Sequence, residues 1–92
     1  MLRKGIRWSA QKDFALRRDP SRLGIGLAEC AEAIREGRLL DQLESTNYPG
    51  QKIAVVEHNG YAFAVPYVEN DEEIFLKTAF PSRKLTRKYL RN

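Results

Sequence analysis

The residue types best suited to phosphate chemistry are concentrated near the C-terminal end of the chain. Residues 77–89 read KTAFPSRKLTRKY and hold five basic side chains but no acidic one. On a helix, Arg83 and Arg87 are four residues apart and share one face, and so do Lys84 and Lys88. Like charges at this spacing repel each other, and a bound phosphate backbone would offset that repulsion. The segment is therefore predicted to contact a polyanion.

Two of these cations fall where a helix by itself disfavours them. Basic residues near a helix C-terminus complement the helix dipole, which accounts for Arg87, Lys88 and Arg91 without any function. Arg83 and Lys84 instead occupy the first turn of the expected helix, where cations are mildly unfavourable but backbone N–H groups can bind an anion. A functional use of Arg83 and Lys84 is therefore preferred over a purely solvated helix face.

The elements that must position this segment are a strand and a helix. The Pro-Ser pair at 81–82 predicts a break and an N-cap for a last helix that runs to residue 90. The preceding strand is expected over residues 74–80, and side-chain alternation within it points Lys77 away from the core. On the helix, Tyr89 offers a ring that can pack and a hydroxyl that can stay at the rim.

Two further helices are expected in the first half of the chain. Ser9 is a good N-cap for a helix over residues 10–18. Apolar residues then recur at the spacing of one helix face at Leu27, Cys30, Ala31 and Ile34. Gly26 is a tolerable N-cap for this second helix, with Glu29 at the third position of a capping box and Gly37 as the C-terminal stop.

Four strands are expected over residues 39–44, 52–57, 61–68 and 74–80. Asn59-Gly60 is a strong hairpin signal, and Pro66 implies a bulge or an unpaired edge because it cannot donate to a ladder. Residues 2–8 form either an edge strand or a loosely docked arm. The expected fold class is α+β, with an antiparallel meander sheet packed with two N-terminal helices and one C-terminal helix, in a single domain over residues 1–92.

The aromatic side chains are expected mainly in the core. Phe63, Phe75 and Phe80 are most simply explained in this way. Tyr61 and Tyr67 share a strand face with Phe63, so packing is the first interpretation for both. A platform on which RNA bases stack is the alternative.

Charge is distributed unevenly along the chain. The 92 residues hold 16 Lys+Arg and 12 Asp+Glu, which gives a formal net charge of +4. Residues 1–22 contribute +5, residues 23–76 contribute −7 and residues 77–92 contribute +6. Two basic ends that flank an acidic middle favour a polyanionic partner.

Several classes of protein are disfavoured by the composition. No apolar run approaches the ~20 residues that a membrane span needs, and the N-terminus lacks the apolar stretch of a signal peptide, so a cytoplasmic protein is expected. The single cysteine, Cys30, cannot form an intramolecular disulfide and is expected to be a buried structural thiol. His58 is the one histidine, and no cluster at metal-ligand spacing accompanies it, so neither a metal nor another cofactor is expected.

Several short stretches, in order along the chain, resemble one protein family. They are IRWSAQK at 6–12, LGIGLAE at 23–29, YPGQK at 48–52, IFLKT at 74–78 and PSRK at 81–84. Their succession resembles the RelE superfamily of bacterial toxin ribonucleases, and more closely its BrnT-like branch. Gly26 stands where a Ser or Thr cap is usual, and Ser9-Ala10 stands where an acidic Asp-Pro-like cap is common. The resemblance implies a RelE-like fold.

The resemblance also implies a function. The family consists of toxins of type II toxin-antitoxin systems, and a chain of this kind would be a metal-independent endoribonuclease that cleaves RNA to halt translation. Its substrate would be mRNA, either free or on the ribosome. BrnT-like toxins typically pair with a ribbon-helix-helix antitoxin encoded alongside, and operator DNA is then bound only through the antitoxin complex. No membrane and no cofactor are implied.

Roles for individual residues follow from the same resemblance. RelE-type enzymes rely on Lys, Arg and Tyr rather than on a pair of histidines, which suits a chain with one histidine. Arg83 and Lys77 are expected to contact the phosphate in the transition state, with Tyr89 as an acid/base or stacking group. His58, beside a hairpin turn, is a weaker candidate. The expected RNA-phosphate contacts are Lys84, Arg87, Arg7 and Lys12.

Two other functions stay open at this point. The same basic ends could clamp phosphates without cutting them, in a non-catalytic nucleic-acid-binding module or a degenerate toxin that keeps its fold. The acidic middle could instead dock a basic partner in a protein-interaction domain. Metal-free RNA cleavage and phosphate binding use the same residue types, so the sequence barely separates the first alternative from an enzyme.

Overall fold

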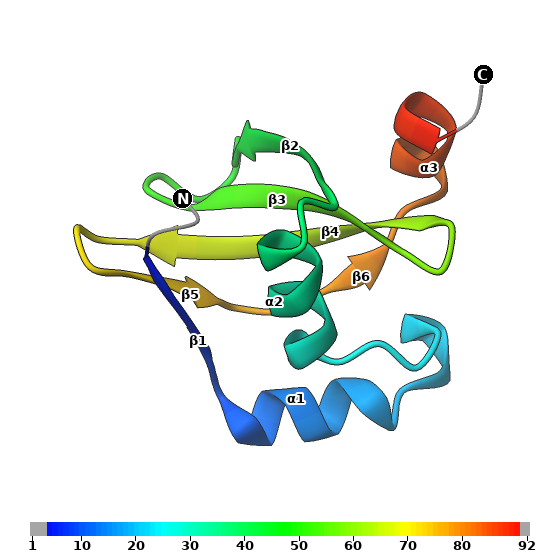
Figure 1. The fold of residues 1–92 in the computed structure, drawn as a ribbon, viewed down its shortest axis with the longest axis horizontal. Coiled ribbons are helices and arrows are strands. Elements are labelled where there is room, and N and C mark those ends of the chain that lie inside the picture. Colours follow the sequence, from blue (N-terminus) through cyan, green and yellow to red (C-terminus); the bar gives the residue numbers. More distant parts are fainter. Residues whose placement is uncertain (1–3, 91–92) are drawn as a thin grey trace.

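The computed structural model describes residues 4–90 (Figure 1). The elements follow in the order β1 (Gly5–Trp8), α1 (Ala10–Arg17), the 3-10 turn η1 (Pro20–Arg22), α2 (Leu27–Arg35), β2 (Leu39–Glu44), β3 (Lys52–His58), β4 (Tyr61–Glu69), β5 (Glu73–Leu76), β6 (Phe80–Pro81) and α3 (Arg83–Leu90). Within this part of the chain no helix has the length and apolar character needed to cross a membrane. Three α-helices and one sheet form the α+β fold that was expected.

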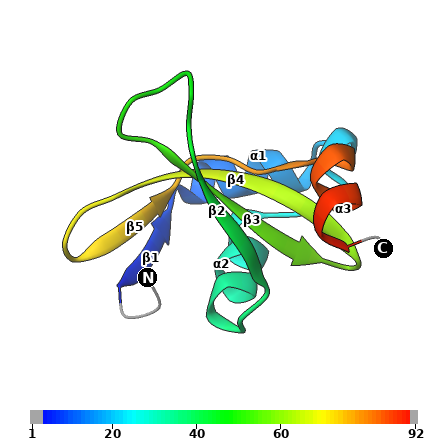
Figure 2. The same ribbon diagram turned by 90° about the horizontal axis from the view of Figure 1, so that it is seen from above.

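The sheet is mixed, so the prediction of a pure antiparallel meander was wrong. Its strands lie in the order β1-β5-β4-β3-β2, and β6 pairs with β4. Strands β2 to β5 are antiparallel neighbours, but β1 runs parallel to β5 at the edge of the sheet (Figure 2). A parallel neighbour needs a long crossover, which the helices and the three middle strands together provide. Of the segment expected at 2–8, Gly5–Trp8 is an edge strand, and residues 2 and 3 lie outside the described residues.

Alternate residues of the strands build one hydrophobic core against α2. In β4 the core-facing residues are Phe63, Val65 and Tyr67, and all three are almost fully buried. They pack with the apolar stripe of α2, which contributes Leu27, Cys30, Ala31 and Ile34 as the helical spacing predicted. Burial of this stripe is the main force that holds α2 on the sheet.

Two of the three phenylalanines expected in the core lie elsewhere. Phe63 is a core residue, 1% exposed. Phe75 lies between the core residues Ile74 and Leu76, so the alternation of β5 directs its side chain to the opposite face of the sheet. Phe80 is 38% exposed. The sheet face away from α2 therefore carries aromatic surface that the sequence interpretation had placed in the core.

Pro66 marks an irregularity in the pairing of β4. Tyr67 pairs with Leu76 of β5, whereas Ala64 pairs with Phe80 of β6. The two β4 residues between these points, 65–66, are therefore opposed by the three residues 77–79. This extra residue is the bulge that Pro66 predicted, because Pro66 has no N–H to donate there. The strand expected over 74–80 is consequently split into β5 and β6, with residues 77–79 between them.

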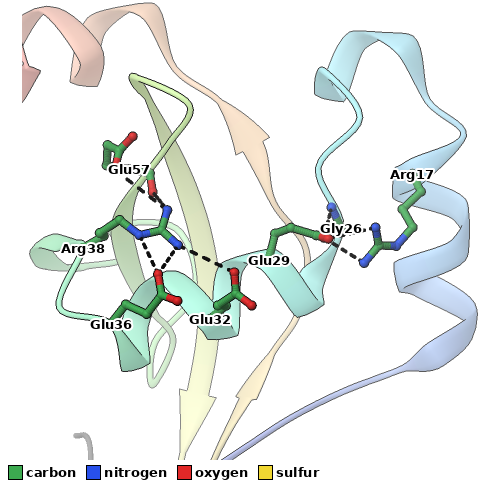
Figure 3. Close-up of polar contacts among 7 residues, drawn as sticks. All are labelled: Arg17, Gly26, Glu29, Glu32, Glu36, Arg38 and Glu57. Carbon is green, nitrogen blue, oxygen red and sulfur yellow. Dashed lines mark hydrogen bonds and ion pairs between the residues drawn. The ribbon is translucent and has the colours of Figure 1, made fainter.

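Helix α2 begins with a cap supplied by another helix. The carboxylate of Asp13 in α1 accepts from the backbone N–H of Leu27 at 2.5 Å, and the N–H of Gly26 donates to Glu29 Oε1 at 3.0 Å. Arg17 binds Glu29 at the same place (Figure 3). A Cβ on Gly26 would come within 2.6 Å of Arg17 Nε and would also collide with the Asp13 carboxylate. Gly26 therefore leaves room for the Asp13 cap.

The other end of α2 is tied to the sheet through Arg38. Gly37 has φ +83°, a conformation that ends the helix as predicted. The Arg38 guanidinium then donates to the carbonyl oxygen of Glu57 at 2.9 Å and to Glu36 Oε1 at 2.8 Å (Figure 3). The contact with Glu57 joins this turn to β3. Arg38 is thus engaged in holding the fold together.

Helix α3 docks on β4 through a buried threonine. The backbone N–H of Ala62 donates to Thr86 Oγ1 at 2.8 Å, and the Thr86 hydroxyl donates to the Ser82 carbonyl oxygen at 2.7 Å. The Ala62 carbonyl in turn accepts from the Ser82 N–H at 3.0 Å. Thr86 therefore continues the hydrogen-bond ladder of β4 beyond the point where β6 ends, which fixes the position of α3 (Figure 1).

Replacing Thr86 by valine is expected to lower the free energy of unfolding by about 1–3 kcal/mol, because the buried Ala62 N–H loses its acceptor. Thr86→Ser keeps the hydroxyl and is expected to be closer to the wild type. Urea unfolding followed by the fluorescence of Trp8 measures both variants. Equal stability of Thr86→Val and the wild type would show that the Ala62–Thr86 hydrogen bond does not hold α3.

Candidate nucleic-acid interface

The first turn of α3 presents two exposed cations. The N–H of Leu85 donates to Ser82 Oγ at 3.1 Å, so Ser82 is the N-cap that was predicted. Arg83 and Lys84 follow directly and are both exposed. They lie at the positive end of the helix dipole, where the backbone N–H groups point outward and an anion is favoured.

The basic residues of this region form a cluster without acidic partners, whereas most basic residues elsewhere in the described chain are paired. Elsewhere in the described chain, the basic side chains that lie within 4.0 Å of a carboxylate are Lys4, Arg7, Arg17, Arg22, Arg38 and Lys52. Within residues 4–90, no carboxylate pairs in this way with Lys77, Arg83, Lys84, Arg87 or Lys88. Their charges are therefore available to an external anion.

Tyr89 of α3 binds an acidic residue that sequence reasoning had missed. Its hydroxyl donates to Asp41 Oδ2 of β2 in a short hydrogen bond. This bond lowers the pKa of Asp41, with help from the backbone N–H of Gln42, and it raises the pKa of Tyr89. The phenol therefore stays protonated at neutral pH. The signal in the sequence was Asp41 itself, an acid within the otherwise apolar start of a strand.

The Tyr89–Asp41 contact also shows which face of the sheet α3 covers. Asp41 pairs in register with Val55, and Val55 pairs with Ala64. Val55 and Ala64 alternate with core residues, and register partners on neighbouring strands share a face, so all three lie on the face away from α2. The predicted catalytic residues on α3 therefore belong to the sheet face that also carries Phe75.

Lys77 lies at some distance from Arg83. Its backbone N–H donates to the Pro66 carbonyl at 2.8 Å, whereas Ser82, next to Arg83, donates to Ala62. These acceptors are four residues apart on β4, or about 13 Å at ~3.3 Å per residue. The Lys77 side chain is exposed, with Nζ 5.8 Å from the ring centroid of Phe75. Lys77 and Arg83 can therefore contact separate parts of one extended ligand.

The structure separates the two N-terminal candidates from α3. Arg7 is an exposed residue of β1 and pairs in register with Phe75, so it lies near Lys77 rather than near α3. Lys12 is an exposed residue of α1, and α1 packs on α2, beyond the opposite face of the sheet. Of the two, only Arg7 is placed to extend the same surface.

Arg22 is a further basic residue that sequence reasoning missed. Its guanidinium donates to the carbonyl oxygen of Ala79 at 3.0 Å and lies 5.9 Å from the ring centroid of Phe80. Asp19 holds it from the other side, with Arg22 Nε 3.4 Å from Asp19 Oδ2. Arg22 thereby fixes the segment that connects Lys77 to α3. No local pattern predicts such a contact between residues far apart in the sequence.

The two other residues with chemically reactive side chains are His58 and Cys30, and the contacts of both are with the protein's own fold. The His58 ring lies at the end of β3, 6.1 Å from the Phe63 ring in an edge-to-face arrangement. Cys30 is fully buried, as expected, and burial raises the pKa of its thiol to about 12. No three His, Cys, Asp or Glu side chains in residues 4–90 are grouped so that they could hold a metal ion.

The Cys30 thiol is expected to resist alkylation in the native protein, since both burial and its raised pKa keep it from forming the reactive thiolate. With iodoacetamide at pH 8, mass spectrometry should find an unmodified chain under native conditions and one added carbamidomethyl group in urea. Rapid modification of the folded protein would contradict the burial of Cys30.

The described surface can bind a chain of phosphates. It combines an acid-free helix N-terminus, an exposed lysine at the Pro66 bulge, and a phenol held by a carboxylate. These groups can neutralise phosphate charge and donate a proton, and they need no metal to do so. Comparison of the chain with models of known protein families, with curated proteins and with solved structures finds no match.

Proposed function

We propose that the chain is the toxin of a type II toxin-antitoxin system of the RelE superfamily, with a BrnT-like architecture. Its activity would be metal-independent cleavage of RNA in the cytoplasm, which inhibits translation. The observation that carries this proposal is the exposed, acid-free first turn of α3, next to the Tyr89–Asp41 pair. Isolated helices disfavour such an arrangement, and a phosphate substrate would stabilise it.

The proposed reaction needs only solvent water and groups that this surface offers. The RNA 2′-oxygen attacks the adjacent phosphorus and passes its proton to a water molecule, the bond from phosphorus to the 5′-oxygen breaks, and the products are a 2′,3′-cyclic phosphate and, once the 5′-oxygen has taken up a proton, a 5′-hydroxyl. Arg83 stabilises the negative charge on the phosphorane, while Lys77, Lys84 and Arg87 hold other phosphates of the chain. Tyr89 is protonated at neutral pH and is the acid/base candidate, and its hydroxyl would turn from Asp41 to protonate the leaving 5′-oxygen.

The proposed partners follow from the same function. The substrate is mRNA, either free or on the ribosome. A ribbon-helix-helix antitoxin encoded beside this chain would neutralise it by forming a complex. Operator DNA would be bound only by that complex, and the reaction would use no cofactor.

A second candidate is a non-catalytic RNA-binding module, including a degenerate toxin. The observation in its favour is that the Tyr89 hydroxyl already has a partner in Asp41, while Arg83, Lys84 and Arg87 of α3 form no ion pair within residues 4–90. In that case the surface would bind phosphates and leave them intact.

Induced expression with RNA-end mapping tests the proposal. The chain is expressed with and without the open reading frame that adjoins its gene, and total RNA is analysed for new 5′-hydroxyl ends. Growth arrest with new ends, relieved by the neighbour, supports the toxin. With the purified protein, cleavage should continue in EDTA. Normal growth and intact RNA, together with tight RNA binding in vitro, would favour the non-catalytic module.

A further inference from the structure

A small cleft lies at the end of the sheet opposite α3. It occupies about 310 Å³ at the β4–β5 turn and is lined by Val68, Glu69, Asn70, Glu73 and Phe75. In Figure 1 this turn and α3 lie at opposite ends of β4. The volume is at the small end of the range for ligand pockets, which fits a single ring system rather than a peptide.

The apolar part of the cleft is flat and accessible. Val68 and Phe75 are register partners on neighbouring strands, on the sheet face away from the core. Val68 is 36% exposed and Phe75 is half-buried. A half-buried aromatic ring beside an aliphatic side chain offers a stacking surface for a planar ligand.

Among the polar side chains that line the cleft, the carboxylate of Glu73 can still accept hydrogen bonds from a ligand. Glu69 is bound by Lys4 at 2.7 Å and Lys52 at 3.2 Å. Asn70 Oδ1 accepts from the backbone N–H groups of residues 72 and 73. Glu73 has only a long contact, 4.0 Å from its Oε2 to Nε of Arg7, and its side chain is 41% exposed. A ligand ring on Phe75 could therefore donate to Glu73.

The charges around the cleft disfavour a cationic ligand. Arg7 and Lys77 lie at the border of the cleft next to Phe75. Glu69 pairs in register with a core residue, so it and its two lysine partners lie toward the α2 face of the sheet. A lysine or arginine side chain of a partner placed on Phe75 would meet Arg7 and Lys77. A nucleotide instead offers a neutral ring to the cleft and phosphates to the cations.

We infer that this cleft binds a guanine base of single-stranded RNA. Guanine presents two adjacent donors, N1–H and the N2 amino group, that a single carboxylate can accept together, whereas adenine presents an acceptor at N1. The inference rests on the proposed RNA substrate and adds sequence selectivity to it. The cleft and the first turn of α3 are about 20 Å apart along β4, between Val68 and Ala62, at ~3.3 Å per residue. The cleft would therefore select a guanine several nucleotides away from the cleaved bond.

The test measures binding on RNA that cannot be cut. Fluorescein-labelled 2′-O-methyl pentamers UUGUU, UUIUU and UUAUU lack the nucleophilic 2′-hydroxyl, and their affinities are measured by anisotropy at one fixed salt concentration. The wild type should bind the guanine pentamer about tenfold more tightly than the adenine one, which corresponds to about 1.4 kcal/mol. The inosine pentamer, without the N2 amino group, should bind with intermediate affinity. Cleavage of ordinary RNA is scored separately, so the two proposals can fail independently.

Three variants connect this preference to the cleft. Glu73→Gln should reduce the guanine preference to within about twofold, whereas Glu72→Gln, an equal charge change at an exposed neighbour, should keep it. Phe75→Ala should weaken all three pentamers by about tenfold alike, through lost stacking. Glu73 is a surface residue, so Glu73→Gln should fold. This variant therefore tests the guanine preference even where Phe75→Ala fails to fold.

Four outcomes would overturn the inference. The first is equal affinity of the wild type for the guanine and adenine pentamers. The second is a guanine preference that survives Glu73→Gln. The third is binding of free 5′-GMP as tight as that of the guanine pentamer and equally dependent on Glu73, which would indicate a free-nucleotide site instead. Binding of an arginine-rich peptide that depends on Glu73 and excludes RNA would likewise assign the cleft to a protein partner.

Discussion

Arg83→Ala is expected to abolish growth arrest and to lower the single-turnover rate of RNA cleavage by about 10²–10³-fold, the effect of removing one group that stabilises transition-state charge. The protein should not be destabilised in return. Arg83 opposes the dipole of α3 in its first turn and has no acidic partner within residues 4–90, so its removal should raise stability by about 0.3–1 kcal/mol at low salt. Lost activity with equal or higher stability is the signature of a residue kept for function.

The control for this variant is Arg35→Ala. Arg35 is an exposed residue of α2 that also has no ion pair among the described residues, so the net charge changes equally. It should leave growth arrest, cleavage and antitoxin binding unchanged. A folded Arg83→Ala protein with full toxicity would refute the proposed catalytic surface, as would equal losses in both variants.

Gly26→Ser is expected to destabilise the protein by about 1–3 kcal/mol, although serine is ordinarily at least as good an N-cap as glycine. The backbone of Gly26 is extended (φ −118°), so serine can adopt its conformation. The cost comes from the new Cβ, which would collide with the Asp13 carboxylate and come within 2.6 Å of Arg17 Nε. Either side chain must move, and the cap on Leu27 is then weakened. Urea unfolding gives the change as a lower midpoint with an unchanged slope.

A double variant separates this cause from general crowding. Asp13→Ala removes the cap and the collision with the carboxylate, leaves Arg17 held by Glu29 alone, and should by itself cost about 1–2 kcal/mol. In Asp13→Ala/Gly26→Ser the serine hydroxyl can take over the cap, so the double variant should be more stable than the sum of the single effects predicts. Strict additivity would mean that Asp13 and Gly26 do not compete for the same space.

The parts of the fold that local patterns govern could be predicted from the sequence. The stripe of α2, the Ser9 and Ser82 caps and the Asn59-Gly60 turn are confirmed, with Asn59 at φ 54° and Gly60 at φ 78°. Each depends on residues within a few positions of one another. Pro66 likewise predicted a bulge, because the missing N–H is a property of that residue alone.

The parts that depend on distant residues could not be predicted in this way. The parallel pairing of β1 with β5 brings together opposite ends of the chain, and the Asp13 cap of α2 comes from a different helix. The meander prediction failed because it paired each strand only with its sequence neighbours. Gly26 was interpreted as a small loss of stability, since its neighbour Asp13 becomes visible only in three dimensions.

For the candidate site, the sequence indicated the cations but not their surroundings. Arg83 and Lys84 were singled out by their place in a helix, and the structure leaves them exposed. The Asp41 partner of Tyr89 and the separation of Lys12 from α3 both depend on the sheet order. The direction of the Phe75 side chain could have been predicted from the sequence. The strand alternation that points Lys77 away from the core applies equally to Phe75, two residues earlier.

The parallel β1–β5 pair also determines the order in which parts of the protein can fold during synthesis. Gly5 pairs with Glu73, about 68 residues later, so β1 leaves the ribosome long before its partner exists. At ~5–20 residues per second, that interval is about 3–14 s. Helix α3 is synthesised later still, and its docking on β4 also requires the hydrogen bonds of Ser82 and Thr86. A nascent chain that has not yet reached β5 and α3 therefore has neither a completed sheet edge nor a docked basic helix.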